Sequence, residues 1–433
     1  MKETLRHLFL STLGRLSVEE VMAEKVRCEN GVLSVGGEQI ELAPFKKIIG
    51  VAIGKAALPM SRALSNIVNP HKMSGVIVSP APAGDLPPYF LHYVGGHPYP
   101  DKQSFHAANV TLELLSDLKK YYLVIYLLSG GGSALCEKPV APEISLADSR
   151  EFFRLLVTCG ANIVEMNVLR KHFSAVKGGR LAQTASPARQ MTLYISDVPV
   201  DKPSTVASGP TMPDESSVED CHEIVERLGL LDKLPAPMRS MFHDRRIPET
   251  PKPGDEIFRN SSWHCLLDNQ AGLDLLRAEA DRQGWVVDQD LSVDDTPLEQ
   301  ATDRLLARLD DLRTRNPGRT VALLTGGELS WPVTGDGWGG RNQAFVLDCA
   351  RKIAGRNIAV VSAGTDGIDG NSEAAGAVAD GTTLERAAQL GLDAADFQNR
   401  SDSYRFFEAL NDLIVTGPSG NNVRDLRLLV AWD

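Results

Sequence analysis

The sequence predicts an α/β protein with two domains, and three observations support this fold class. Apolar runs of strand length recur along the chain, each followed by a turn signal and a segment of helical period. The runs are continuous in Val, Ile and Leu, which is typical of parallel strands covered by helices on both faces. The 433 residues also exceed the roughly 250 to 300 that one hydrophobic core organises. The predicted strands are 48–53, 75–78, 123–128, 191–195, 264–267, 321–324 and 358–361.

The remaining elements follow from local signals in chain order. The first residues mix charged and apolar side chains and predict an amphipathic helix, and the segment 32–42 carries Gly36-Gly37 between two apolar runs, as in a β-hairpin. Later helix starts pair a capping residue with an acid three positions on, at Ser145/Asp148, Ser216/Glu219, Thr296/Glu299 and Thr382/Glu385.

A proline-rich stretch marks the expected domain boundary. Five prolines lie between Pro235 and Pro253, and such density favours a stiff, extended connector. We therefore expect a Rossmann-like N-terminal domain over 1–246, a linker over 247–257 and a smaller α/β domain over 258–433.

Composition and charge exclude several classes of protein. Acidic residues outnumber basic ones by 56 to 45, and a net charge of -11 argues against nucleic acid or an acidic membrane surface as the main partner. The mean hydropathy of -0.14 and the short longest apolar run, 121–128, argue against a membrane span. The six cysteines show no C-x-x-C spacing and the N-terminus lacks a signal-peptide core, so we expect reduced thiols in a cytoplasmic protein.

The strongest local signal is the segment 126–135, where a predicted strand runs into Gly130, Gly131 and Gly132 and then Ser133. Residues without side chains let backbone N–H groups approach a phosphate closely, and a helix N-terminus adds a favourable dipole. A tight turn is the alternative, but three successive glycines exceed what a turn requires. The sequence therefore predicts a phosphate-binding site. A nucleophile elbow is excluded because Ala134 and Leu135 follow Ser133.

A lysine follows another predicted strand, in the segment 50–57. This segment resembles a P-loop but is one residue short between its glycines, and Ala56 stands where a hydroxyl would hold Mg²⁺, so a Walker A site is rejected. Lys55 remains just past a strand's carboxyl end, where ligands of open parallel sheets collect. A solvated surface charge is the alternative.

A glycine-rich segment over 324–343 ends in Arg341. Gly335, Gly337 and Gly340 satisfy G-x-G-x-x-G, but no clean strand precedes them, and Val361 stands where a dinucleotide fold would place a ribose-binding acid. We prefer a loop that presents Arg341 to a carboxylate or phosphate, because a guanidinium binds either group through two parallel hydrogen bonds.

Two further polar stretches contribute candidate residues for substrate and metal binding. The segment 167–180 concentrates five potential cations around a Gly-Gly break, which offers Lys177 and Arg180 for substrate binding. Asp197 follows a predicted strand and is a candidate Mg²⁺ ligand, because that ion takes one or two carboxylates together with phosphates and water. An aspartate that caps its own loop is the alternative. Asp366 and Asp369 fit either of two roles, as turn residues or as a second group of acidic residues that lines the site.

Seven ordered motifs resemble the MOFRL-type glycerate 2-kinase family and span nearly the whole chain. They are VAIGKAA (51–57), LLSGGGSAL (127–135), GANIVEMNVLRKHFSAVKGGRLA (160–182), SDVPVDKPSTVASGPT (196–211), TGGELSWPVTGDGWGGRNQ (325–343), SAGTDGIDG (362–370) and DSYRFFEALNDLIVTGPSGNNVRDL (402–426).

The resemblance implies two α/β domains with the active site in the cleft between them. It implies phosphorylation of D-glycerate to 2-phosphoglycerate by ATP with Mg²⁺, with Lys55 and Arg341 as the functional lysine and arginine. A monomer and a homodimer both stay open. Relatives are also labelled hydroxypyruvate reductase, but the glycine fingerprint is poorly placed and no histidine follows His264, so an NAD(P)H-dependent reductase is only the alternative.

Overall fold

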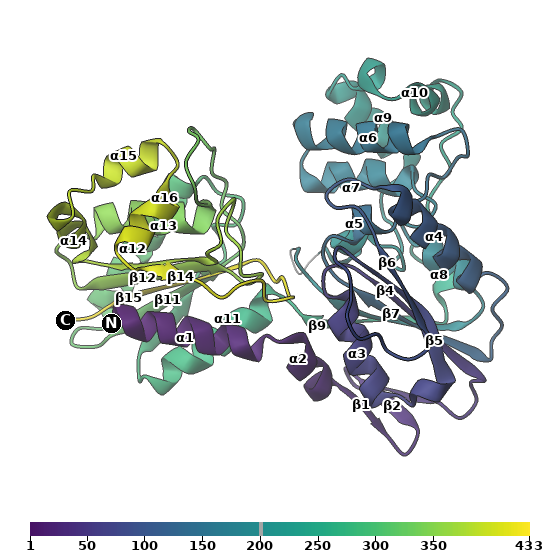
Figure 1. The fold of residues 1–433 in the computed structure, drawn as a ribbon, viewed down its shortest axis with the longest axis horizontal. Helices are drawn as coiled ribbons and strands as arrows, with labels where there is room; N and C mark the ends of the chain where they lie inside the picture. Colours follow the sequence, from purple (N-terminus) through teal and green to yellow (C-terminus); the bar gives the residue numbers. More distant parts are fainter. Residues whose placement is uncertain (199–201) are drawn as a thin grey trace. The chain divides into compact units, whose positions relative to one another are not determined.

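The computed structural model describes residues 1–198 and 202–433, which form two compact α/β units (Figure 1). The parallel-sheet unit is the continuous segment Val18–Leu266, and the mixed-sheet unit combines Met1–Ser17 with Leu267–Asp433. Each unit is built around its own six-stranded sheet, which confirms the predicted fold class. No described helix is both long and apolar enough to span a bilayer.

The parallel-sheet unit has the strand order β6-β5-β4-β7-β8-β9. Its strands are β4 (Lys47–Ile53), β5 (Met73–Ser79), β6 (Phe90–Val94), β7 (Tyr122–Leu128), β8 (Arg189–Ile195) and β9 (Ser261–Leu267). The pairs from β6 through β8 are parallel. The chain moves outward from β4 through β5 to β6 and then returns to place β7 on the other side of β4. The strand order therefore reverses between β4 and β7, and ligands of open α/β sheets bind at such a switch point.

Helices complete the parallel-sheet unit in two groups. The elements near the sheet are α2 (Val18–Lys25), α3 (Ala57–Ile67), α4 (Lys102–Leu115), α5 (Gly132–Leu135) and α8 (Arg180–Ala185). A separate helical layer contains α6 (Leu146–Thr158), α7 (Ile163–His172), α9 (Val218–Arg227) and α10 (Ala236–His243) (Figure 1). This layer has its own apolar core, which includes Phe152, Leu169 and Met241. The predicted hairpin is confirmed within a small antiparallel sheet of β1 (Val26–Glu29), β2 (Val32–Val35) and β3 (Glu38–Glu41).

The mixed-sheet unit has the strand order β10-β11-β15-β12-β13-β14. Its strands are β10 (Val286–Gln289), β11 (Val321–Gly326), β12 (Ile358–Gly364), β13 (Gly376–Asp380), β14 (Leu413–Ile414) and β15 (Asp425–Ala431). Its helices are α1 (Lys2–Arg15), α11 (Asn269–Arg282), α12 (Leu298–Arg315), α13 (Arg341–Lys352), α14 (Thr383–Gln389), α15 (Ala394–Asn399) and α16 (Ser403–Ala409). Strand β15 runs antiparallel between β11 and β12. The start of β15 therefore meets the carboxyl ends of both neighbours, with Asp425 opposite Gly364.

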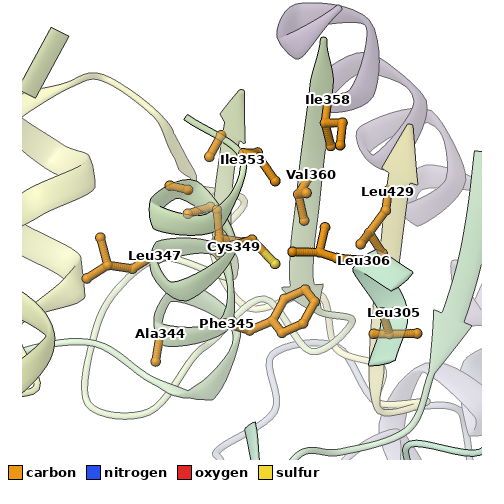
Figure 2. Packing of buried hydrophobic residues seen from close by; sticks show 14 of the residues in the cluster. Leu305, Leu306, Ala344, Phe345, Leu347, Cys349, Ile353, Ile358, Val360 and Leu429 are labelled. Carbon is orange, nitrogen blue, oxygen red and sulfur yellow. The ribbon is translucent and has the colours of Figure 1, made fainter. Parts of the chain in front are cut away.

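The core of the mixed-sheet unit lies between α13 and the sheet. Phe345 and Cys349 lie four residues apart on one face of α13, and Ile353, the C-cap residue, continues this spacing. Figure 2 shows Phe345 and Cys349 pointing toward Val360 of β12, and all of these side chains are fully buried. This packing fixes the start of α13, where Arg341 lies.

The predicted domain boundary at 247–257 is wrong. Ile247 is buried in the helical layer, and Thr250, only 2% exposed, donates a hydrogen bond to Asp214. The prolines do mark an extended chain, but that chain packs inside the parallel-sheet unit and leads into β9, an edge strand of the same sheet. The chain passes between the units near Ser17 and Leu266 instead, because α1 packs with the C-terminal half.

The predicted helix starts are correct to within one residue. The Ser145/Asp148 capping box is present. The next box uses Ser217 and Asp220 instead of Ser216 and Glu219, because the Ser216 hydroxyl bonds to Asp214. Two further starts have no side-chain cap, since α12 begins after Pro297 and Thr382 makes no capping bond to α14.

Candidate functional site

The loops that follow β4 and β7 are bonded to each other at the switch point of the parallel sheet. The Lys55 backbone N–H donates to the Gly130 carbonyl over 2.9 Å, and the Ala56 N–H donates to Ser129 Oγ over 2.9 Å. Parallel pairing of β4 with β7 brings these loops to one edge of the sheet. Lys55 and the glycine-rich loop, 75 residues apart in sequence, therefore share one site.

The glycine-rich loop is shaped by close approaches to its neighbours. Gly131 precedes α5 with φ of 84°, and a β-carbon there would lie 3.3 Å from His97 Cδ2 and 3.4 Å from Lys55 Cγ. The space beside the Gly130 α-carbon is filled by the Asp197 carboxylate, and that beside Gly132 by the methyl group of Ala207. The first N–H groups of a helix have no partner within it. The structure thus brings together Lys55, the glycine loop and Asp197, and their roles stay predictions.

A pocket of about 210 Å³ opens beside this loop. Its lining includes Gly130, Gly131, Ser133 and Asp197, and it adds His97, Asn167 and Arg170, which the sequence reasoning did not single out. Burial and the charge of Lys55 both lower the pKa of His97, so its imidazole is neutral at neutral pH.

Arg170 is the most distinctive of these additional residues. Its guanidinium lies over the Phe153 ring, with Cζ 5.0 Å from the ring centroid. Its Nε atom is buried with no hydrogen-bond partner among residues 1–198 and 202–433. Burial lowers the pKa of Arg170, but an arginine stays protonated at neutral pH. Its spacing of three from Asn167 on α7 is the signal that could have singled it out, because residues three apart share a helix face.

Lys177 and Arg180 lie elsewhere, and neither lines this pocket. Lys177 is 1% exposed and forms an ion pair with the equally buried Glu137. Burial lowers the pKa of Lys177 to about 7, and the electrostatic interaction with Cys136 opposes that shift. Arg180 donates to the carbonyls of Pro248 and Glu249 and so holds the proline-rich segment in place. The role of both residues in substrate binding stays a prediction, and their contacts are those of structural residues.

A strained turn and a set of buried hydroxyls close one side of the pocket. Ala207 and Ser208 both have positive φ, at 49° and 60°, a conformation that is costly for residues other than glycine. Ser208 Oγ lies 2.6 Å from Ser133 Oγ and donates to Asn167 Oδ1 over 2.8 Å. These bonds join the turn, the glycine loop and α7.

A second cavity, of about 790 Å³, shares Asn167 and Thr205 with the smaller pocket and therefore lies next to it. Its lining combines apolar and aromatic side chains, among them Val164, Met212 and Trp263, with a buried ion pair of Lys171 and Asp214 at 2.9 Å. The smaller pocket and this cavity both belong wholly to the parallel-sheet unit.

Arg341 begins α13 in the mixed-sheet unit. It binds Asp425 through Nε at 2.6 Å and Nη2 at 3.1 Å and contacts Glu328 at 3.0 Å. Burial opposes its charge, but the carboxylates of Asp425 and Glu328 outweigh burial and raise the pKa of Arg341. Asp369 accepts the backbone N–H groups of Asn342 and Gln343 and so caps α13, while burial raises its pKa to about 6.

The three glycines of the fingerprint-like sequence pack against their own unit. The spaces beside Gly335 and Gly337 are filled by the backbone around Arg400, and that beside Gly340 by Asp369. Glycine is required here for close packing of one loop on another, which leaves no open cradle for a pyrophosphate at these residues. This packing argues against a dinucleotide site.

The described residues provide few protein ligands for a metal ion. No group of three or more His, Cys, Asp or Glu side chains with metal-binding geometry occurs within 1–198 and 202–433. Residues 199–201 of the motif that follows Asp197 lie outside the described residues. A single carboxylate beside a phosphate loop fits Mg²⁺, which commonly retains several waters and takes its other ligands from substrate phosphates. It does not fit a metal that needs a full protein ligand set.

The fold is that of an α/β enzyme with a candidate phosphate site at the switch point of a parallel sheet, and comparison with known proteins identifies its family. Residues 4–243 match a family described as a domain of unknown function, DUF4147, and residues 321–425 match the MOFRL family. The chain belongs to the MOFRL-type glycerate 2-kinase family.

Three similar proteins illustrate the family. The D-glycerate 2-kinase of Thermotoga maritima is 34% identical, over 88% of this chain and 89% of its own. A crystal structure of glycerate kinase from the same organism superposes with a TM-score of 0.85 at 30% identity, covering 99% of both chains. A protein of Agrobacterium vitis, 36% identical over 89% of this chain and 99% of its own, carries a provisional name as a hydroxypyruvate reductase.

Proposed function

We propose that this protein transfers the γ-phosphoryl group of ATP to the 2-hydroxyl of D-glycerate. The observation that carries the proposal is the convergence of Lys55, the 130–133 loop and Asp197 at the switch point of the parallel sheet. Sequence and structural similarity to proteins named as glycerate kinases supports the proposed substrate and reaction.

Phosphoryl transfer asks a protein mainly to position two substrates and to stabilise negative charge. Backbone N–H groups at Gly131 and Gly132 hold nucleotide phosphates, and the Lys55 ammonium stabilises the phosphoryl group in transit. Asp197 would hold Mg²⁺, which supplies positive charge to the phosphates when it is bound. The family resemblance makes Arg341 the functional arginine, for the glycerate carboxylate or the phosphoryl group. ATP and glycerate must bind a chain of net charge -11, so these local cations are essential.

The cavity of about 790 Å³ supports a place for the nucleoside of ATP. Its volume lies within the roughly 300 to 1,000 Å³ typical of pockets for ligands of that size, and its walls are largely apolar. It adjoins the pocket beside the phosphate loop at Asn167 and Thr205. We assign the base and ribose to this cavity.

Substitution of the proposed residues tests this function. Lys55→Ala and Arg341→Ala should each lower kcat/KM by at least ~10²-fold, about 2.7 kcal/mol of transition-state stabilisation. Asp197→Asn should raise the Mg²⁺ concentration needed for half-maximal activity. Oxidation of NAD(P)H with hydroxypyruvate, in the absence of ATP turnover with glycerate, would establish the reductase alternative. Near-wild-type activity of both alanine variants would refute the assignment of Lys55 and Arg341.

A further inference from the structure

We propose that the pocket of about 210 Å³ is the subsite for the hydroxy acid, in which Arg170 binds the substrate carboxylate and Ser133 Oγ accepts a hydrogen bond from a substrate hydroxyl. The inference rests on the proposed function and assigns its acceptor substrate to the parallel-sheet unit. It also gives Ser133 a different role from the glycines beside it.

The positive charge of Arg170 would be stabilised by an anionic group in the pocket. The guanidinium lines the pocket and stacks on Phe153, and its Nε is buried with no hydrogen-bond partner among the described residues. A buried guanidinium N–H without a partner is costly, since it loses hydration and gains no compensating hydrogen bond. A carboxylate in the pocket would supply two acceptors in the planar arrangement that a guanidinium favours.

Ser133, Ser208 and Asn167 form a chain of hydrogen bonds, and the direction of these bonds decides whether Ser133 acts as a donor or an acceptor toward the pocket. Ser208 donates its one proton to Asn167 Oδ1, which is an oxygen that only accepts. Ser133 must therefore be the donor in the 2.6 Å contact with Ser208. With its own proton used in this way, Ser133 Oγ presents only lone pairs to the pocket, and it suits a hydroxyl donor better than a phosphate oxygen.

The same chain cannot serve as a route for proton removal. A proton passed from the substrate through Ser133 and Ser208 would arrive at an amide oxygen, which is a very weak base. Asn167 and Ser208 are therefore positioning residues that fix the orientation of the Ser133 hydroxyl. Both are well buried, at 4% and 0% exposure, so solvent does not compete for these bonds.

The size of the pocket discriminates between the two substrates. At about 210 Å³ it falls below the roughly 300 to 1,000 Å³ typical of pockets for larger ligands, whereas the adjoining cavity of about 790 Å³ does not. A small pocket that presents one guanidinium and one acceptor matches a short hydroxycarboxylate. Gly131 lines it and Lys55 lies beside Gly131, where the phosphoryl group would arrive.

Calorimetric titration of the full chain tests this subsite, with D-glycerate and Mg-free ADP as separate probes. Arg170→Gln should weaken glycerate binding by at least ~30-fold, because it leaves the carboxylate without its charged partner, and should change ADP binding less than twofold. Arg154→Gln is the matched control, since Arg154 also stacks on an aromatic ring, Tyr99, but does not line the pocket. It should bind both ligands like the wild type.

The hydroxyl chain is tested by three variants. Ser133→Ala should raise the KM for glycerate about 3- to 10-fold, the effect of one neutral hydrogen bond, with the KM for ATP unchanged. Ser208→Ala should act in the same direction, because it releases the Ser133 proton. Asn167→Ala should also act in the same direction, because Ser208 loses its acceptor and is then free to donate its proton to Ser133.

Two outcomes would overturn the proposal. Weaker ADP binding in Arg170→Gln with glycerate binding intact would make Arg170 a nucleotide-phosphate contact. A changed Mg²⁺ requirement in Ser133→Ala, with the KM for glycerate unchanged, would make Ser133 a metal ligand. Failure of the proposed function is distinguishable, because it would appear as absent ATP turnover in the wild type, whatever the variants do.

Discussion

Substituting Gly131 with alanine separates the geometry of the phosphate loop from the general strain of adding a side chain. Gly131 has φ of 84°, and its neighbours His97 and Lys55 would lie 3.3 and 3.4 Å from the new β-carbon. Gly160, in the same unit, also has φ of 84° but has nothing within 4 Å of that position. The two alanine variants therefore share the backbone strain and differ in what the methyl group meets.

The stability change should be similar in the two variants. An L-residue in the left-handed region costs about 1 to 2 kcal/mol, and the reduced entropy of the unfolded chain returns about 0.4 to 1 kcal/mol. The net loss is about 1 kcal/mol, or roughly 2 to 4 °C in Tm for a unit of this size. The added contacts at Gly131 cost little folding energy, because the Lys55 and His97 side chains can move aside.

Catalytic activity should distinguish the Gly131→Ala variant from the Gly160→Ala variant. Displacement of Lys55 by even part of an ångström should lower kcat/KM of Gly131→Ala by at least ~10-fold, since misplacing a catalytic group is expensive. Gly160→Ala should stay within twofold of the wild type. Thermal denaturation and steady-state kinetics with ATP and D-glycerate provide both measurements. Equal activity of the two variants would refute the placement of Lys55 and the glycine loop in the site.

Three further predictions follow from individual contacts. Lys177→Met should destabilise the protein by about 3 to 5 kcal/mol in urea denaturation, because Glu137 loses its buried partner, while activity per folded molecule persists; a raised KM for glycerate without loss of stability would contradict this. Burial raises the pKa of Asp369 to about 6, so the folded state holds this proton more tightly than the unfolded one and stability should fall as pH rises from about 4 to 6. The Asp369→Asn variant should lack this loss of stability in thermal melts across the same pH range. An unchanged dependence of Tm on pH in the variant would exclude Asp369 as the cause. Val164→Trp should raise the KM for ATP by filling the larger cavity, with the KM for glycerate unchanged and Val157→Trp, exposed on α6, as control; an effect confined to glycerate would contradict the nucleoside assignment.

Most of the fold was predictable because buried strands carry a strong signal. All seven predicted runs form strands, since central strands must be apolar on both faces. Among the strands outside these seven runs, β6 and β10 lie at sheet edges, and β13 consists mostly of small residues. The sequences of β6 and β10 are only partly apolar because an edge strand is less covered, and their periodic signal is correspondingly weak.

The domain boundary was not predictable from local signals. Prolines after residue 235 indicate an extended chain, but they do not indicate what that chain packs against. The contribution of α1 to the C-terminal unit depends on contacts more than 400 residues apart in sequence, such as Lys2 with Asp412. Such contacts leave no mark in a single sequence.

The site was predictable where backbone geometry specifies it and not where it depends on side-chain direction. Three successive glycines after a buried strand pointed to the phosphate loop, and Lys55 follows the neighbouring strand. The stretch 167–180 contains five potential cations, but the helical turn decides that Arg170 lines the pocket while Lys177 is buried against Glu137.

The central claim is tested most directly by identifying the product of the reaction. Purified protein is incubated with ATP, Mg²⁺ and D-glycerate, and enolase alone is then added to the mixture. Immediate formation of phosphoenolpyruvate is predicted, because enolase acts on 2-phosphoglycerate. Phosphoenolpyruvate that forms only after phosphoglycerate mutase is also added would contradict transfer to the 2-hydroxyl, and no phosphoenolpyruvate under either condition would contradict the kinase itself.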